Sequence, residues 1–145
     1  MITVGIGGAS RSGKDTVAAF AIQYVGGRTI AFADAMKKLI GPVFEWNAEV
    51  LYGPSERRNQ VDYRFGSTDA RVKVWRRFDE VVESWLKQHL PTGISHDAAS
   101  LKLHGWLSNV LHASEITPRR VLQMLGDAGR SLRPSFWIDV TFDEL

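Results

Sequence analysis

Five residues near the N-terminus have the types and the spacing of a loop that binds phosphate: Gly8, Gly13, Lys14, Asp15 and Thr16. Four residues separate Gly8 from the Gly13-Lys14 pair, as in nucleotide-binding phosphate loops. Glycines let backbone N–H groups wrap around phosphate oxygens, and the following helix directs further N–H groups at the anion. The lysine supplies a mobile positive charge for the β- and γ-phosphates. The pattern predicts that residues 8–16 bind ATP.

One position of this loop departs from the usual pattern. Asp15 stands where Ser or Thr is normal, and a hydroxyl follows one residue later at Thr16. We expect Arg11, Ser12 and Thr16 to contact ATP together with the glycines and Lys14. Asp15 has two interpretations. Its carboxylate could bind Mg²⁺ directly or through water, or it could complement the dipole of the following helix.

The segments around the loop predict a β-α-β unit. The apolar residues 2–6 predict a strand, and an amphipathic helix follows the loop until Gly26-Gly27 end it. Residues 28–32 predict a second, parallel strand. Asp34 comes directly after it, at the edge where open α/β sheets bind ligands. It could orient an acceptor phosphate, hold a magnesium-bound water or bond a sugar hydroxyl; alternatively it caps the next helix.

The rest of the chain has mainly helical patterns. Apolar residues at helical spacing predict helices after Asp34 and over 70–88 and 98–112. Thr117-Pro118 is a start signal for another helix. The polar residues 53–68 predict a loop or lid-like connection with exposed arginines. Residues 137–142 are too few for periodicity to distinguish a strand from a helix.

Composition narrows the class of protein. A chain of 145 residues with 44% hydrophobic and 23% charged residues is typical of one soluble globular domain. We see neither a membrane span nor a secretory signal, which predicts a cytoplasmic protein. The absence of cysteine excludes disulfides and thiolate zinc sites. Net charge is only +2 and the basic residues are dispersed, so the sequence does not predict nucleic-acid binding.

Four segments together resemble a known family. They are residues 10–16, 32–37 and 52–59, and a last segment that runs from Thr117 through Gln123, Gly126 and Arg130 to Asp139. In this order, and with the Lys-Asp-Thr form of the loop, the chain resembles the deoxynucleoside monophosphate kinases of tailed bacteriophages. The resemblance implies transfer of the ATP γ-phosphate to a deoxynucleoside 5′-monophosphate with Mg²⁺, in the cytoplasm of the host if a phage encodes the protein.

The resemblance also implies site residues. Lys14 and Arg130 would be catalytic, because phosphoryl transfer depends on positioning and on neutralising charge. Arg119, Gln123 and Arg130 share one side of their predicted helix. Trp137 could stack on a base or pack in the core. The predicted acceptor-binding residues are Asp34, Lys37, Arg57, Arg119, Gln123, Arg130 and Trp137.

The predicted fold is therefore an α/β phosphate-loop kinase domain spanning 1–145, a parallel sheet with flanking helices and a helix-rich insertion. Its core would be residues 1–45 and its helical acceptor-binding region about 46–133. Only two strands are evident, which predicts an incomplete sheet and either a homo-oligomer or further residues after Leu145. Two other functions stay open: a small-metabolite kinase and an inert nucleotide-binding remnant.

Overall fold

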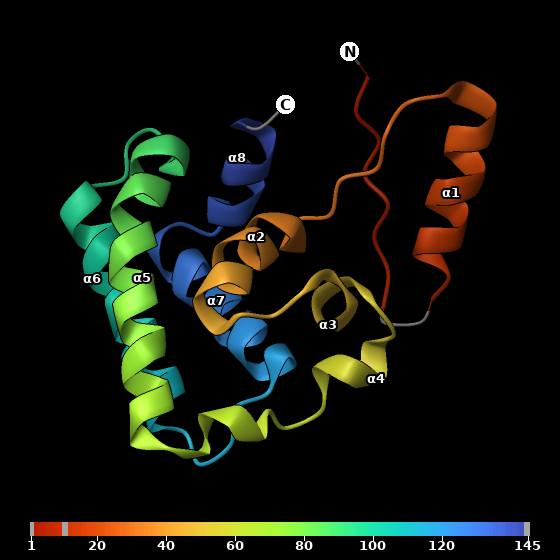
Figure 1. Ribbon diagram of the computed structural model, residues 1–145. Helices are drawn as coiled ribbons and strands as arrows, with labels where there is room; N and C mark the ends of the chain where they lie inside the picture. The colour runs from red at the N-terminus through yellow and green to blue at the C-terminus, as the bar shows by residue number, and fades with distance from the viewer. Residues whose placement is uncertain (1, 10–11, 144–145) are drawn as a thin grey trace. The chain divides into compact units, whose positions relative to one another are not determined.

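The computed structural model describes residues 2–9 and 12–143 (Figure 1). The chain divides after Ala31 into two compact units, here called unit 1 (residues 1–31) and unit 2 (residues 32–145). The described residues of unit 1 include one helix, α1 (Lys14–Val25). The helices of unit 2 are α2 (Ala33–Phe44), α3 (Ala48–Tyr52), α4 (Ser55–Arg58), the 3₁₀ helix η1 (Tyr63–Gly66), α5 (Thr68–His89), α6 (His96–His112), α7 (Pro118–Leu132) and α8 (Phe136–Asp143).

The predicted parallel sheet, and with it the α/β fold class, is wrong. Residues 2–8 and 26–31 are irregular, and the residues that the structure describes include no strand. Strands of a parallel sheet are buried on both faces, whereas Ile2 and Val4 are 93% and 76% exposed. Between residues 32 and 143 the apolar residues recur at helical spacing and form helices, so that part of the chain offers no strand for the N-terminal segments to pair with.

The helix that follows the loop forms as predicted, but its apolar face is not buried. Val17, Phe20 and Tyr24 are 56%, 61% and 71% exposed, and α1 contains no buried residue. The Phe20 and Tyr24 rings lie 4.7 Å apart, one helical turn from each other. These side chains are the ones that a sheet would cover in the predicted fold.

The main helices of unit 2 confirm the periodicity of the sequence, and polar caps begin several of them. Ser67, Ser95 and Thr117 each accept a hydrogen bond from a backbone N–H in the first turn of α5, α6 and α7. Such caps satisfy N–H groups that have no partner within the helix. The segment 137–142, which periodicity left undecided, lies in α8.

The polar connection at residues 53–68 is more ordered than a loop, since it contains α4 and η1. Asp62 caps η1 by accepting from the Arg64 N–H at 3.1 Å. Arg64 also donates to the backbone carbonyl of Phe44 at 3.2 Å, which fixes η1 against the end of α2. The predicted loop or lid-like connection therefore contains two short helical turns, and its Arg57 and Arg64 are exposed as expected.

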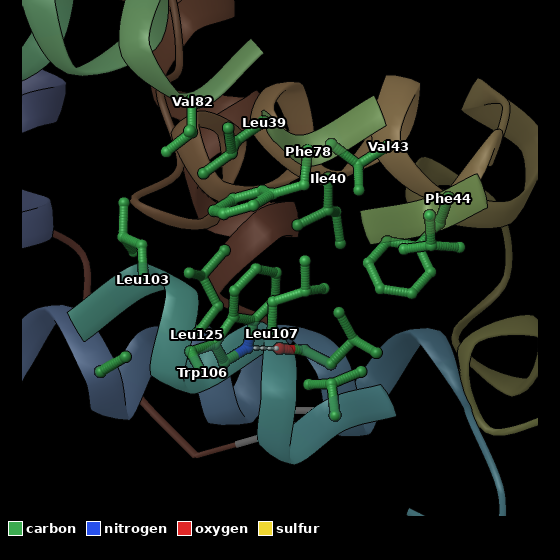
Figure 2. Packing of buried hydrophobic residues seen from close by; sticks show 14 of the residues in the cluster. Leu39, Ile40, Val43, Phe44, Phe78, Val82, Leu103, Trp106, Leu107 and Leu125 are labelled. Carbon is green, nitrogen blue, oxygen red and sulfur yellow. Dashed lines mark hydrogen bonds between the residues drawn. The ribbon is translucent and has the colours of Figure 1, made fainter. Parts of the chain in front are cut away.

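A single hydrophobic core holds unit 2 together (Figure 2). Helix α2 packs against α5, α7 and α8, and α6 packs against α5 and α7. Phe44, Phe78 and Leu107 are fully buried where these helices meet. The Trp106 indole, also in the core, donates to the backbone carbonyl of Val121 at 3.3 Å. The labelled side chains in Figure 2 come from α2, α5, α6 and α7, so the core joins elements far apart in sequence.

Candidate functional site

The described residues of the predicted phosphate loop are joined by a hydrogen bond directly before α1. The Ser12 N–H donates to the Ala9 carbonyl at 3.2 Å. Gly13 follows with φ 83° and ψ 14°, a left-handed conformation that favours glycine. Helix α1 then begins at Lys14. The sequence placed a glycine where the turn requires one. Arg11, a predicted ATP contact, lies outside the described residues.

The start of α1 has the local features of an anion-binding helix terminus. Lys14, Asp15 and Thr16 form its first turn. Its N-cap residue is Gly13, which has no side chain to satisfy the N–H groups of that turn. Those N–H groups and the partial positive charge of the terminus favour an anion. A Cβ atom on Gly8 would lie 2.4 Å from the Ser12 hydroxyl oxygen, so the two ends of the loop approach closely.

In unit 2, residues 48–59 make a compact double turn, here called the α3–α4 segment. Asn47 caps α3 by accepting from the Val50 N–H at 3.1 Å. A Cβ atom on Gly53 would lie 2.1 Å from the Glu49 carbonyl oxygen, so this position requires glycine. Arg58 donates to the carbonyls of Leu51 at 2.9 Å and Gly53 at 3.2 Å. The segment is therefore held by backbone geometry and by one of its own arginines.

Three of the predicted acceptor-binding residues contact residues of this segment. Arg119, in the first turn of α7, donates to the Ser55 hydroxyl at 2.8 Å and to the Asn59 side-chain oxygen. The Lys37 ammonium lies 4.5 Å from the centre of the Tyr52 ring. Arg57 forms an ion pair with Glu49. Lys37 of α2 and Arg119 of α7 thus each contact a residue of the segment that contains Arg57.

The other predicted residues on α7 lie away from this segment. Arg130 is eleven residues after Arg119, which corresponds to about 16 Å along the helix axis. Its guanidinium pairs with the exposed Asp127 at 2.5 Å. Gln123 is exposed, one turn after Arg119. The predicted shared side of the helix therefore spans most of its length instead of converging on one point.

Asp34 and Trp137 occupy different environments. Asp34 lies in the first turn of α2, which begins at Ala33, so it does not cap that helix. Trp137 is only 4% exposed and donates its indole N–H to the Gly126 carbonyl at 3.3 Å. Its ring packs against Phe136 and Trp85 at centroid distances of 4.9 and 5.9 Å. This geometry corresponds to the packing interpretation of Trp137.

The best-buried charged network of the polar connection is structural. The Trp46 indole donates to the Asp62 carboxylate at 2.8 Å, and Arg64 donates to it at 2.7 Å. Burial acts to raise the pKa of Asp62, but the hydrogen bonds from Arg64 and Trp46 outweigh it and hold that pKa below its usual value. The bond to Asp62 in turn raises the pKa of Arg64. The hydrogen bonds of Arg64 therefore stabilise the fold.

Sequence reasoning missed the contacts that hold Arg119. Ser55 and Asn59 lie in the segment that carries the family resemblance, but neither was a candidate site residue. Both residues matter because their segment packs against the start of α7 at Thr117-Pro118-Arg119, a contact that only the tertiary structure reveals.

An open groove of about 600 Å³ lies between α5 and α6 and contains none of the predicted residues. It is lined by Thr68, Arg71, Val72, Trp75, Ser108 and His112, among others.

The described residues contain no group of three or more His, Asp or Glu side chains arranged to hold a metal ion. Within the same residues, none of the helices has the length and apolar character needed to cross a membrane.

Comparison with curated proteins finds one partial similarity. The chain is 34% identical over 73 residues to a protein of Acanthamoeba polyphaga mimivirus named "Putative deoxynucleotide monophosphate kinase". The match covers 50% of this chain and 38% of that protein, so the chain spans about two fifths of its relative's length. No family model matches the chain, and no solved structure matches it. The similarity supports a nucleotide kinase at a coarse level and leaves the bacteriophage family a prediction.

Proposed function

We propose that this chain is an ATP-dependent kinase that transfers a phosphoryl group to a deoxynucleoside 5′-monophosphate. The turn at Gly13 and the start of α1 at Lys14 carry this proposal, because they combine the sequence and the local geometry of a phosphate-binding loop. The contacts of Lys37, Arg57 and Arg119 with residues of the α3–α4 segment support an anionic acceptor there. The partial similarity to a protein named as a deoxynucleotide monophosphate kinase agrees with both.

The proposed roles follow from charge and position. The N–H groups at the start of α1 bind phosphate oxygens of ATP, and Lys14 neutralises the β- and γ-phosphates. Arg119, with Lys37 and Arg57, binds the 5′-phosphate of the acceptor through the planar fork and the point charge suited to phosphate. Arg130, which is exposed and pairs with Asp127 at 2.5 Å, lies about 16 Å along α7 from Arg119, so we assign it no part in binding the same acceptor phosphate.

Asp15 is the proposed magnesium ligand. It lies in the first turn of α1, beside Lys14, and its side chain is exposed. One carboxylate, the nucleotide's phosphates and water form a donor set that Mg²⁺ accepts, because this ion keeps several waters and needs no all-protein cage. When bound, the ion supplies further neutralisation of phosphate charge.

Calorimetry tests the phosphate loop. Lys14→Ala should weaken ATP binding by about tenfold or more, because it removes the charge that faces the phosphates. Lys102→Ala removes an equal charge from the exposed surface of α6 and should leave ATP affinity unchanged. If Lys14→Ala binds ATP as tightly as the unaltered protein, the proposed site is wrong.

A turnover assay with a panel of acceptors tests the reaction. Phosphorylation of a deoxynucleoside monophosphate is the expected result. Activity confined to a small phosphorylated metabolite would assign the chain to the other kinase class. ATP binding without turnover of any acceptor would show a nucleotide-binding protein that is not a kinase.

A further inference from the structure

We propose that Ser55 and Asn59 are positioning residues that hold the Arg119 guanidinium ready for the acceptor phosphate without neutralising it. This inference rests on the proposed function. Arg119 donates through Nε to the Asn59 side-chain oxygen and through Nη2 to the Ser55 hydroxyl at 2.8 Å, with a longer bond to the Ser55 carbonyl at 3.5 Å. All three acceptors are neutral oxygens at the two ends of α4.

Arg119 differs from three other arginines, which form ion pairs: Arg57 with Glu49, Arg64 with Asp62 and Arg130 with Asp127. Arg58 resembles Arg119 in bonding to neutral oxygens, but both of its acceptors are backbone carbonyls. In the described part of the chain, no carboxylate lies within ion-pair distance of Arg119. A guanidinium fixed by neutral acceptors keeps its full charge, and it binds phosphate more strongly than one that must first release a carboxylate.

Arg119 lies at the end of α7 that favours an anion. Arg119 and Arg120 lie in the first turn of α7, which carries no acidic residue. The N-terminal end of a helix is the positive end of its dipole, so a cation there is disfavoured unless an anion is nearby. The hydrogen bonds to Ser55 and Asn59 offset that repulsion and hold the guanidinium in place without removing its charge. A bound phosphate would add a favourable interaction with both the guanidinium and the helix terminus.

Asn59→Asp separates positioning from simple stabilisation. The two side chains have the same shape, but aspartate would form an ion pair with Arg119 and neutralise it. A structural role predicts an equal or higher melting temperature with unchanged substrate binding. Our proposal predicts an equal or higher melting temperature, a KM for the deoxynucleoside monophosphate raised by about tenfold, and an unchanged KM for ATP. Asn109→Asp introduces the same charge at an exposed position of α6 and is the matched control.

Three further variants, with a conservative fourth, complete the test. Asn59→Ala and Ser55→Ala loosen Arg119 without neutralising it, and each should raise the acceptor KM by about threefold. Arg119→Ala should raise it most, and Arg119→Lys should restore only part of the loss because lysine lacks the planar fork.

The outcomes distinguish this inference from the function beneath it. If the unaltered protein neither binds nor phosphorylates a deoxynucleoside monophosphate, both proposals are wrong. If the unaltered protein is active and Arg119→Ala impairs acceptor binding, while Asn59→Asp has the same acceptor KM as Asn109→Asp, only the positioning role is wrong. A KM for ATP that rises in step with that for the acceptor would also overturn the positioning role.

Discussion

Unit 1 and unit 2 differ in how far their folding depends on distant contacts. In unit 1, a turn and one helix form from local hydrogen bonds, and α1 contains no buried residue. In unit 2, the buried apolar residues of the described chain gather in one core that runs from Ala35 to Val140. The phosphate-loop motif can therefore specify its own turn, but it does not by itself bury the helix that follows.

The physical reason is the range of the hydrogen bonds. A helix satisfies its backbone groups within four residues, so a periodic sequence can form it before any packing occurs. A strand has no such local partner and needs another strand beside it. Unit 2 consists of helices with apolar faces that meet one another, whereas the strand-like segments of unit 1 have no strand to pair with among the described residues.

The largest expected effect comes from truncating the same side chain in each unit. Phe78 is fully buried, and Phe20 is 61% exposed. Phe78→Ala should lower the free energy of unfolding by about 3–5 kcal/mol, whereas Phe20→Ala should change it by less than about 0.5 kcal/mol. All five tryptophans lie in unit 2, so urea unfolding followed by tryptophan fluorescence reports on that unit. Amide hydrogen exchange of α1 reports on unit 1.

The Phe78→Ala and Phe20→Ala variants can also contradict the difference between the two units. Loss of α1 protection in Phe20→Ala, with a stability loss close to that of Phe78→Ala, would mean that the Phe20 ring is buried in the protein in solution. The difference between the two units would then disappear, and a covered α1 would have to be sought.

The helices of unit 2 could be predicted from sequence because their signals are local. Periodic apolar residues and the Ser67, Ser95 and Thr117 caps lie within the segments that they organise. The glycine at position 13 was predictable for the same reason, since its left-handed backbone is a property of one residue.

Tertiary pairing was beyond such reasoning. Nothing in the residues around Arg119 indicates that Asn59, sixty residues earlier, would accept its hydrogen bond. The predicted sheet was wrong because residues 2–6 favour an extended strand, but strand propensity alone does not provide a second strand to pair with. The η1 turn was missed because its signal is a single capping contact, from Asp62 to the Arg64 N–H.

A pair of glycine substitutions gives the next largest effect and probes packing within unit 2. A Cβ atom on Gly129 would lie 2.3 Å from Nε1 of Trp137 and 2.8 Å from Phe136, so this glycine lets α8 approach α7 closely. Gly129→Ala should therefore destabilise the protein by about 1–3 kcal/mol through overpacking. A Cβ atom on Gly105, which is exposed within α6, would meet no neighbouring atom within 4 Å. Gly105→Ala should raise the free energy of unfolding by about 0.5–1 kcal/mol. Urea unfolding of both variants is the measurement, and equal changes in their free energies of unfolding would contradict the packing of α8 on α7.

The smallest expected effect concerns the pH dependence of stability, and it distinguishes the partly buried Asp62 contact of unit 2 from an exposed carboxylate. Because its pKa is held below the usual value in the folded state, Asp62 stabilises the fold at pH values above about 4, where the carboxyl of the unfolded chain is also ionised. As the pH falls below about 4, the unfolded chain takes up the proton more readily, and this contribution is progressively lost.

Asp62→Asn removes the titrating group but leaves an acceptor for the Trp46 indole, which donates to the native carboxylate at 2.8 Å. At pH 7 it should cost about 1 kcal/mol, because a charged hydrogen-bond acceptor becomes neutral while the partly exposed Arg64 remains screened by solvent. The variant should lose less stability than the unaltered protein between pH 5 and pH 3, whereas Glu80→Gln, at an exposed position of α5, should not change that slope. The free energy of unfolding is measured by urea titration at each pH. If it falls equally with decreasing pH in Asp62→Asn and in the unaltered protein, the acid destabilisation comes from other groups. The Trp46–Asp62–Arg64 network would then not favour the ionised carboxylate.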